Sequence, residues 1–150
     1  TEVSAETGHD ALVVFDLAFD YHAARRVAVA RADQTSESAL STVCGLFQAL
    51  GKEVTVINDV PGLLVMRTVC MLANEAADAV NQGVAHVADI DTAMCKGVNY
   101  PKGPLAWADS LSINNVFHVL DNLHRSYGEE RYRPSILLRR KAFAKTSFYG

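Results

Sequence analysis

The sequence lacks a glycine-rich phosphate-binding motif. Its nine glycines stand at positions 8, 45, 51, 62, 83, 97, 103, 128 and 150, and no three of them form G-x-G-x-x-G or a P-loop. Such motifs place backbone N–H groups around the phosphates of a nucleotide. The chain therefore has no standard site of its own for a dinucleotide cofactor.

Patterns for disulfides and metal ions are also missing. Cys44, Cys70 and Cys95 have no C-x-x-C spacing and lie in apolar surroundings. We expect them to be reduced, buried residues of a cytoplasmic protein. His118 and His124 are six residues apart, which places them on different faces of a helix, and no cysteine or carboxylate is spaced to complete a site. We predict no metal ion.

Strong charge of one sign and long hydrophobic runs are absent as well. The net charge is −3 in 150 residues, which favours neither nucleic acid nor an anionic membrane surface as a partner. No run approaches the roughly 18 apolar residues of a membrane span. With 49% hydrophobic residues, the chain can bury a core. The first ten residues show only a weak structural pattern and lack an initiator Met, which suggests that the sequence is a piece of a longer chain.

Strands and one helix alternate in the first part of the chain. An amphipathic helix is bracketed by Ser36 as its N-cap and Gly51 as its C′ glycine. Runs that favour β-structure surround it, at residues 12–19, 26–30 and 52–57. Residues 1–58 are therefore expected to be a small α/β segment.

From Asp59 onward the sequence favours helices. In "DVPGLLVMR", Asp59 can cap a helix and Pro61 suits an early-turn position, which predicts a helix from Pro61 to Gln82. Further helices are predicted over residues 88–96, from position 104, from 112 to 128 and from 134. Residues 59–150 are expected to form a helical domain.

Isolated polar and aromatic residues carry little chemistry by themselves. His22 could be catalytic, but a solvated loop histidine is the better interpretation. Asp89 and Asp91 point to different sides of a helix, so they are expected to be first-turn carboxylates favoured by the helix dipole rather than an acid/base pair. Asn74 is expected on a wet or interfacial face. Trp107 could line a pocket, although a core anchor is the more common role.

A longer resemblance runs from about residue 40 to residue 149. The chain contains, in order, "ALGK", "DVPGLLVMR", "NEA", "GVAHVADID", "PKGPLAWAD" and "KTSFYG". These segments resemble the C-terminal domain of the 3-hydroxyacyl-CoA dehydrogenases. That family has "ALGK", "D-x-P-G-F-x-x-N-R", "NEA", "G-x-A-x-x-x-D-I-D", "P-x-G-P-x-x-x-x-D" and "K-T-G-x-G-F-Y".

The resemblance implies a mainly α fold. A helical domain like the C-terminal domain of 6-phosphogluconate dehydrogenase would follow a small α/β remnant of the end of a Rossmann domain. In the family, a Rossmann domain binds NAD, and the helical domain completes the acyl-CoA cleft and usually forms the dimer. A histidine acts as general base on the 3-hydroxyl while hydride leaves for the nicotinamide, and a glutamate supports the imidazole.

The catalytic residues of that family are not retained when its pattern is laid on this chain. The family's "H-F-F-N-P" histidine falls on Leu17, and the "L-V-E-V" glutamate falls on Val29, 12 residues later. Neither side chain can move a proton. The asparagine of "P-G-F-x-x-N-R", which faces substrate in the family, falls on Met66. A remnant of the substrate cleft stays at this place, consisting of Pro61, Gly62, Met66 and Arg67.

These departures resemble the second, degenerate copy in the longer bacterial enzymes of the phenylacetate-degradation type. The resemblance implies a fragment without catalysis or bound NAD of its own, which packs against its own N-terminal catalytic domain and forms a homodimer. An acyl-CoA-binding lobe that completes the cleft of the intact enzyme is the alternative, with the region of Lys102 and Trp107 as its test. A module recruited to another partner is a third reading, for which no motif is present.

Overall fold

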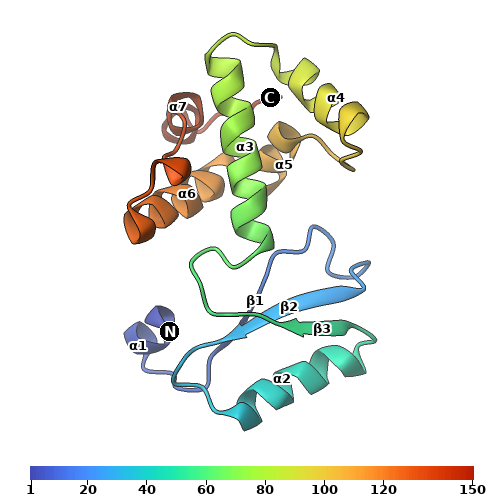
Figure 1. Cartoon of the computed structure of the whole chain (residues 1–150), viewed down its shortest axis with the longest axis vertical. Coiled ribbons are helices and arrows are strands. Elements are labelled where there is room, and N and C mark those ends of the chain that lie inside the picture. Colours follow the sequence, from blue (N-terminus) through green and yellow to red (C-terminus); the bar gives the residue numbers. More distant parts are fainter. The chain divides into compact units, whose positions relative to one another are not determined.

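The computed structural model describes residues 1–150, and the chain separates into two compact units. The first unit is Thr1–Met66 and the second is Arg67–Gly150. In Figure 1 the first unit is coloured blue to green and the second green to red. The first holds all the strands, and the second is built from helices. The predicted mainly α fold with a small α/β segment is confirmed.

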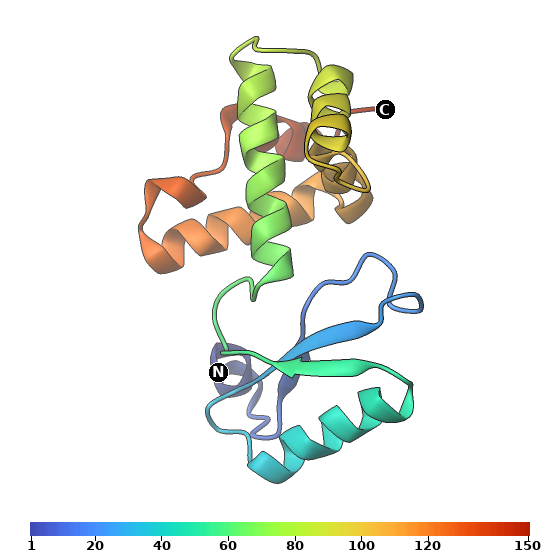
Figure 2. The same cartoon turned by 45° about the vertical axis from the view of Figure 1, so that its right-hand side comes forward.

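The first unit is a three-stranded sheet with a helix on one face. The strands are β1 (Val13–Phe15), β2 (Arg26–Arg31) and β3 (Glu53–Val56), in the order β1-β2-β3. Strand β2 pairs antiparallel with β1 and parallel with β3. Figure 2 shows α2 (Glu37–Ala49) lying along the sheet. The buried contact joins Leu40 of α2 to the alternate residues of β2 that face it, Val27 and Val29.

The predicted ends of α2 are confirmed. The Ser36 hydroxyl accepts a hydrogen bond from the Ala39 backbone N–H at 3.2 Å, and Gly51 follows the helix with φ of 75°. Strand β1 is shorter than the predicted run over residues 12–19. After Phe15 the chain leaves the sheet and forms a turn in which the Asp20 carboxylate accepts from the backbone N–H of His22.

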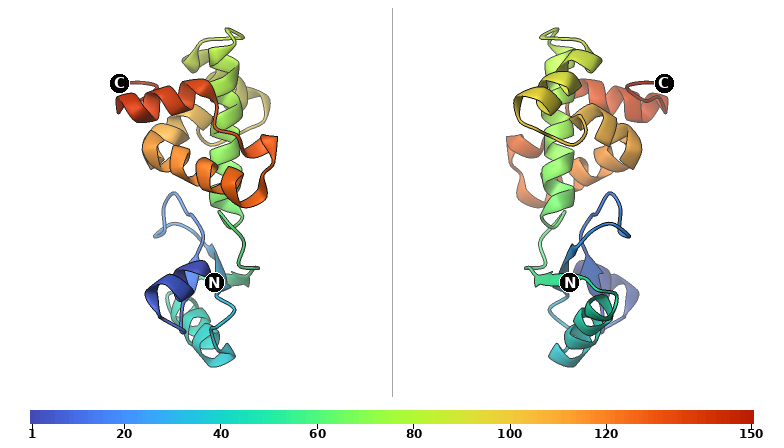
Figure 3. Two further views of the ribbon diagram at one scale, coloured as in Figure 1. Left: turned by 90° about the vertical axis from the view of Figure 1, so that its left-hand side faces the viewer. Right: turned by 90° about the vertical axis from the view of Figure 1, so that its right-hand side faces the viewer.

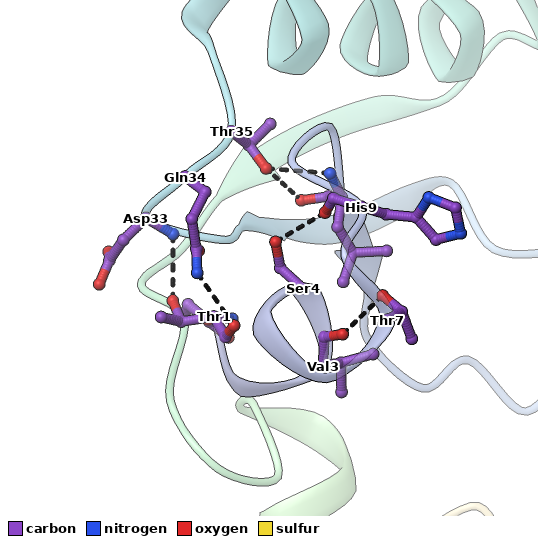
Figure 4. Close-up of polar contacts among 10 residues, drawn as sticks. Thr1, Val3, Ser4, Thr7, His9, Asp33, Gln34 and Thr35 are labelled. Carbon is purple, nitrogen blue, oxygen red and sulfur yellow. Dashed lines mark hydrogen bonds and ion pairs between the residues drawn. The ribbon is translucent and has the colours of Figure 1, made fainter.

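A short N-terminal helix, α1 (Glu2–Thr7), had no signal in the sequence pattern. It is anchored by polar contacts shown in Figure 4. The Asp33 backbone N–H donates to the Thr1 hydroxyl at 3.0 Å. The Thr35 hydroxyl, 2% exposed, both donates to the Leu12 carbonyl at 2.7 Å and accepts from the Leu12 N–H at 3.0 Å. Side-chain hydrogen bonds therefore hold α1 and β1 against the turn at residues 32–35.

The second unit contains the helical domain. Its elements are α3 (Val65–Asn81), whose first turn begins in the first unit, α4 (Val87–Gly97), α5 (Pro104–Leu111), α6 (Ile113–Tyr127), the 3₁₀ helix η1 (Glu130–Tyr132) and α7 (Ile136–Ala144). Figure 3 shows α7 lying beside α6. None of the helices combines the length and the apolar composition needed to cross a bilayer.

Helix α6 supplies much of the core of the second unit. Its buried residues recur every three or four positions, as the sequence predicts, and they are Ile113, Val116, Phe117, Leu120 and Leu123. The helix ends at Gly128, which has φ of 65°. This apolar stripe accounts for the position of the helix within its own unit.

Two helices start later than predicted. Helix α3 begins at Val65 rather than Pro61, because Gly62 and Leu63 have φ of 73° and 48° and form a left-handed turn before it. Helix α7 begins at Ile136 rather than at Pro134. The Ser135 hydroxyl is its N-cap and accepts from the Leu138 N–H at 3.2 Å.

Asp91 has a different role from the one expected. Asp89 does lie in the first turn of α4, but Asp91 is buried and caps another helix. Its carboxylate accepts from the backbone N–H groups of Leu105 and Ala106, both at 2.9 Å, at the start of α5. The Tyr149 hydroxyl also donates to it at 2.8 Å. Burial, together with the hydrogen bond and charge of Asp91, raises the pKa of Tyr149 to about 12.

The cap made by Asp91 requires glycine at position 103. A Cβ on Gly103 would lie 2.1 Å from Cγ of Asp91, whereas a Cβ on Gly97 would meet nothing within 4 Å. We expect Gly103→Ala to lower the free energy of unfolding by roughly 1 to 3 kcal/mol through overpacking. Gly97→Ala, the matched control, should change it by less than about 1 kcal/mol.

Urea unfolding followed by the fluorescence of Trp107 measures this difference, because this only tryptophan is buried in the second unit. Equal unfolding midpoints for the two variants would contradict the role assigned to Gly103.

Candidate functional site

Leu17 and Val29, onto which the resemblance lays the family's catalytic pair, lie in or beside the small sheet. Val29 is 0% exposed in β2 and belongs to the core beneath α2. Leu17 is half-buried and follows β1 by two residues. Both side chains are hydrocarbon, so neither can accept a proton, donate one or orient an imidazole. Both residues therefore serve packing in or beside the sheet.

A buried carboxylate lies next to Leu17, and the sequence analysis missed it. Asp16 is 3% exposed. Its Oδ2 accepts from the backbone N–H groups of Leu64 at 2.9 Å and Val65 at 2.6 Å. Its Oδ1 accepts from the N–H of Met66 at 3.1 Å and from that of Leu17 at 2.7 Å. Four backbone donors therefore converge on one side chain, and all of these residues belong to the first unit.

This carboxylate brings two of the candidate positions together. The backbone N–H groups of Leu17 and Met66 both donate to Oδ1 of Asp16. Val29 is not among the residues that donate to Asp16, and its side chain packs with Leu40 in the core. The backbone groups of Leu17 and Met66 thus meet at Asp16, whereas Val29 lies in the core.

Asp16 also replaces the expected cap of α3. The sequence suggested Asp59 as the capping residue, but Asp59 lies six residues before the helix and contacts the amino group of Thr1 instead. Helix α3 has no acidic residue in its first turn. Asp16, 48 to 50 residues away along the chain, supplies both the acceptors and the negative charge that a helix start favours. Local sequence patterns cannot show a cap over that distance.

The other residues predicted to form a remnant of the substrate cleft are placed as follows. Pro61 is exposed, Gly62 takes the left-handed conformation of the turn, and Met66 is half-buried. The Met66 thioether is at best a weak acceptor, so it does not reproduce the hydrogen bonds of an asparagine amide. These residues preserve the geometry of a helix start and present little polar chemistry.

Arg67 takes part in an aromatic cluster of the second unit. Its Nη2 donates to the Tyr127 hydroxyl at 2.8 Å, and its Nη1 lies 3.5 Å from the Tyr132 hydroxyl. The guanidinium carbon lies 5.1 Å and 5.8 Å from the centres of the same two rings. Hydrogen bonds and cation–π contacts therefore link α3 to the end of α6 and to η1. Part of the arginine's donor capacity serves the fold.

Asn74 of the "NEA" segment is buried, so the expectation of a wet or interfacial position was wrong. The side chain is 4% exposed. Its amide nitrogen donates to the Arg133 carbonyl at 2.9 Å, and its amide oxygen accepts from the Ser135 backbone N–H at 2.7 Å. Asn74 thus satisfies backbone groups just before α7, which is a structural task.

The remaining candidates show no site geometry. His22 and His118 are exposed, and His124 is half-buried with Nδ1 3.1 Å from the Glu129 carbonyl. Trp107 is buried, and its ring centre lies 5.6 Å from that of Tyr100, in agreement with a core anchor. No three His, Cys, Asp or Glu side chains come close enough together to hold a metal ion. Cys70 is buried, and its burial raises the thiol pKa to about 12.

An apolar groove with a basic rim lies on the second unit. It has a volume of about 890 Å³ and is formed by α6, the segment after η1 and α7. Ile136 and Phe143 are 58% and 68% exposed there, and the Arg139 guanidinium lies over the Phe143 ring, 5.8 Å from its centre. Exposed large apolar residues grouped in this way are typical of a protein interface.

Two family models match the chain one after the other. The first, for the 3-hydroxybutyryl-CoA dehydrogenase reduced Rossmann-fold domain, matches residues 1–61. The second, for the C-terminal domain of 3-hydroxyacyl-CoA dehydrogenase, matches residues 62–147. The two matches meet in the turn that precedes α3.

Individual relatives agree with these models. The 3-hydroxyadipyl-CoA dehydrogenase of Escherichia coli (strain K12) is 46% identical over 129 residues, which are 86% of this chain and 27% of that protein. The crystal structure of an Escherichia coli 3-hydroxybutyryl-CoA dehydrogenase matches with a TM-score of 0.81 at 47% identity, covering 88% of this chain and 27% of the other.

The crystal structure of an (S)-3-hydroxybutyryl-CoA dehydrogenase from Ralstonia eutropha matches with a TM-score of 0.85 at 30% identity. The match covers 97% of this chain and 52% of that protein. The chain therefore spans from 27% to 52% of the length of these proteins.

The aromatic cluster around Arg67 is open to a direct test. We expect Arg67→Ala to lower the free energy of unfolding by roughly 1 to 2 kcal/mol, because two tyrosine rings lose both a hydrogen-bond donor and a cation. Arg125→Ala is the matched control, since Arg125 is largely exposed and pairs only with Asp121 one turn away on α6. Its effect should stay below about 0.5 kcal/mol. Urea titration monitored at Trp107 compares them, and a larger loss for Arg125→Ala would contradict this ranking.

Proposed function

The chain belongs to the 3-hydroxyacyl-CoA dehydrogenase family, and on that premise we propose that it is a non-catalytic part of an NAD-dependent, cytoplasmic member that serves domain packing and dimerisation. The proposal is supported above all by the resemblance, which lays Leu17 and Val29 on the positions of the family's catalytic pair, and by the burial of Val29 in the core. We divide the chain into the α/β remnant of a Rossmann-domain end, residues 1–58, and the helical domain, residues 59–150.

The reaction expected of the family needs groups that these positions do not supply. Oxidation of a 3-hydroxyl requires a base that takes the hydroxyl proton while hydride leaves C3 for NAD. Leu17 has no lone pair for that proton, and Val29 cannot support a cation. No glycine-rich motif is present to hold the pyrophosphate of the cofactor. Catalysis and NAD are therefore assigned to an N-terminal catalytic domain of the parent enzyme.

The lengths of the relatives support a parent with a second, degenerate copy. The matched part makes up 27% of the Escherichia coli chain but 52% of the Ralstonia eutropha chain, so the former is clearly the longer protein. The longer protein is also the more similar in sequence, with 47% identity against 30%. We therefore propose a parent of the long, phenylacetate-degradation type, in which this chain follows an intact catalytic unit.

The groove formed by α6 and α7 supports the dimerisation part of the proposal. Ile136 and Phe143 expose apolar side chains on this face. A two-fold interface would bury these two side chains from each copy, so the patch would contribute its apolar area twice to the stability of a homodimer. In this proposal the partner is a second copy of the same domain.

An acyl-CoA-binding lobe is the second candidate function. It is favoured by the retention of Pro61, Gly62 and Arg67 in the family's substrate-facing segment. It is disfavoured by Met66 at the asparagine position and by the hydrogen bonds that occupy Arg67. A KM for acyl-CoA in the intact enzyme that depends on the Lys102 or Trp107 region would favour this function over simple packing.

The proposed lack of catalytic activity can be tested by activity measurements. The chain at micromolar concentration should not oxidise 3-hydroxybutyryl-CoA or 3-hydroxyadipyl-CoA with NAD, as followed by NADH absorbance. Met66→Asn should stay inactive, because the base and the cofactor motif are both missing. Measurable turnover by either pure protein would overturn the proposal.

The assembly state should depend on the apolar groove. We expect sedimentation equilibrium to give a dimer without ligand and Phe143→Asp to shift it to a monomer, because two carboxylates would be buried in a symmetric interface. Val84→Asp is the matched control, since Val84 is exposed in the loop between α3 and α4. A monomer that assembles only with acetoacetyl-CoA would favour the acyl-CoA-binding function instead.

A further inference from the structure

Helix α7 presents two arginines beside the exposed apolar residues of the groove. Ile136 and Phe143 are 58% and 68% exposed. Arg139 and Arg140 stand three or four positions from each of them, and residues with this spacing lie on one face of a helix. Both arginines are exposed and line the groove. A contact that buries Ile136 and Phe143 therefore also brings both guanidinium groups into the interface.

Neither arginine has a carboxylate partner within the chain. The Arg139 guanidinium lies over the ring of Phe143, and Arg140 takes part in no ion pair or hydrogen bond. The carboxylate that lines the groove, Asp121, is already paired with Arg125 one turn away on α6. Six of the 14 Arg and Lys residues stand in the last 20 positions, which contain no Asp or Glu. The positive charge of this face is therefore not neutralised by its surroundings.

A second copy of the chain does not supply the missing negative charge. The exposed apolar residues of the groove lie on α7, whereas the α6 side contributes the polar residues Asp121 and His124 and a Phe117 that is only 8% exposed. The proposed homodimer therefore buries most apolar surface when the α7 helices of the two copies face each other. A two-fold interface places the same residues on both sides. Four guanidinium groups then lie in one partly desolvated interface, where like charges repel each other.

We propose that Arg139 and Arg140 of two copies together form a phosphate-binding site between their α7 helices. The site rests on the proposed dimerisation through the groove, and it adds the anion that neutralises the charge of that groove. A guanidinium group can donate two parallel hydrogen bonds to a phosphate, and one phosphate has enough oxygens to accept from both copies. A single chain offers half of these donors, so the site is incomplete in the monomer.

Sedimentation equilibrium of the 150-residue chain in two buffers of equal pH and ionic strength tests this site. One buffer contains sodium chloride and the other contains inorganic sodium phosphate. We expect the Kd of the dimer to be roughly tenfold lower in phosphate, because phosphate bridges the guanidinium groups whereas chloride only screens them. In a phosphate titration, log Kd should fall with log phosphate concentration with a slope of about −1 or steeper, since each dimer takes up at least one phosphate.

A double variant shows whether the two arginines hold the phosphate. Arg139→Gln combined with Arg140→Gln removes both the repulsion and the charged donors. We expect this variant to dimerise with the same Kd in both buffers, and more tightly in chloride than the unsubstituted chain. Arg25→Gln combined with Arg26→Gln is the matched control, since these are two neighbouring exposed arginines of the first unit and the change in net charge is the same. The control should keep the full response to phosphate.

The possible outcomes separate this site from the dimerisation on which it rests. A dimer whose Kd is equal in chloride and phosphate would overturn the site and leave the dimerisation intact. A phosphate response that survives in the arginine double variant would do the same. A monomer in both buffers at every loading concentration would reject the dimerisation itself, and the site with it. A phosphate-strengthened dimer that loses its response only with Arg139 and Arg140 supports the proposal.

Discussion

Unpaired backbone N–H groups at helix starts are the constraint that organises this chain. Each start must find acceptors, and three buried polar side chains supply them from distant positions. Asp16 holds the start of α3, Asp91 holds that of α5, and Asn74 binds the backbone just before α7. Packing in the apolar core determines which side of each helix is buried, whereas these hydrogen bonds stabilise the helix starts.

The same constraint explains which features the sequence could predict. The apolar stripe of α6 and the caps of α2 are local, so periodicity and neighbouring residues were sufficient to place them. The start of α3 was predicted four residues too early, because Asp59 and Pro61 form a plausible local cap while the true acceptor is Asp16. Spacing along the chain contains no information about a bond between residues 48 or more positions apart.

The candidate site was predictable only through resemblance. Leu17, Val29 and Met66 have no property that marks them as catalytic positions, since each is an ordinary apolar residue of a strand or helix. Aligned motifs identified them, and the structure then showed what surrounds them. Neither the local sequence pattern nor the aligned motifs pointed to Asp16, because its role follows from its burial and from N–H donors on another element.

The bond between Asn74 and the Ser135 backbone has a consequence for the order of folding. Helix α7 has nine residues and no acidic residue in its first turn, so it is too short to persist alone in water. Its own Ser135 caps it, and the backbone N–H of that residue donates in turn to Asn74 of α3, 61 residues earlier in the chain. We therefore expect α7 to form after α3 and the longer helix α6, on a surface that these two helices provide. Contacts between residues so far apart in the chain raise the contact order, which is associated with slower folding than a purely local helical bundle shows.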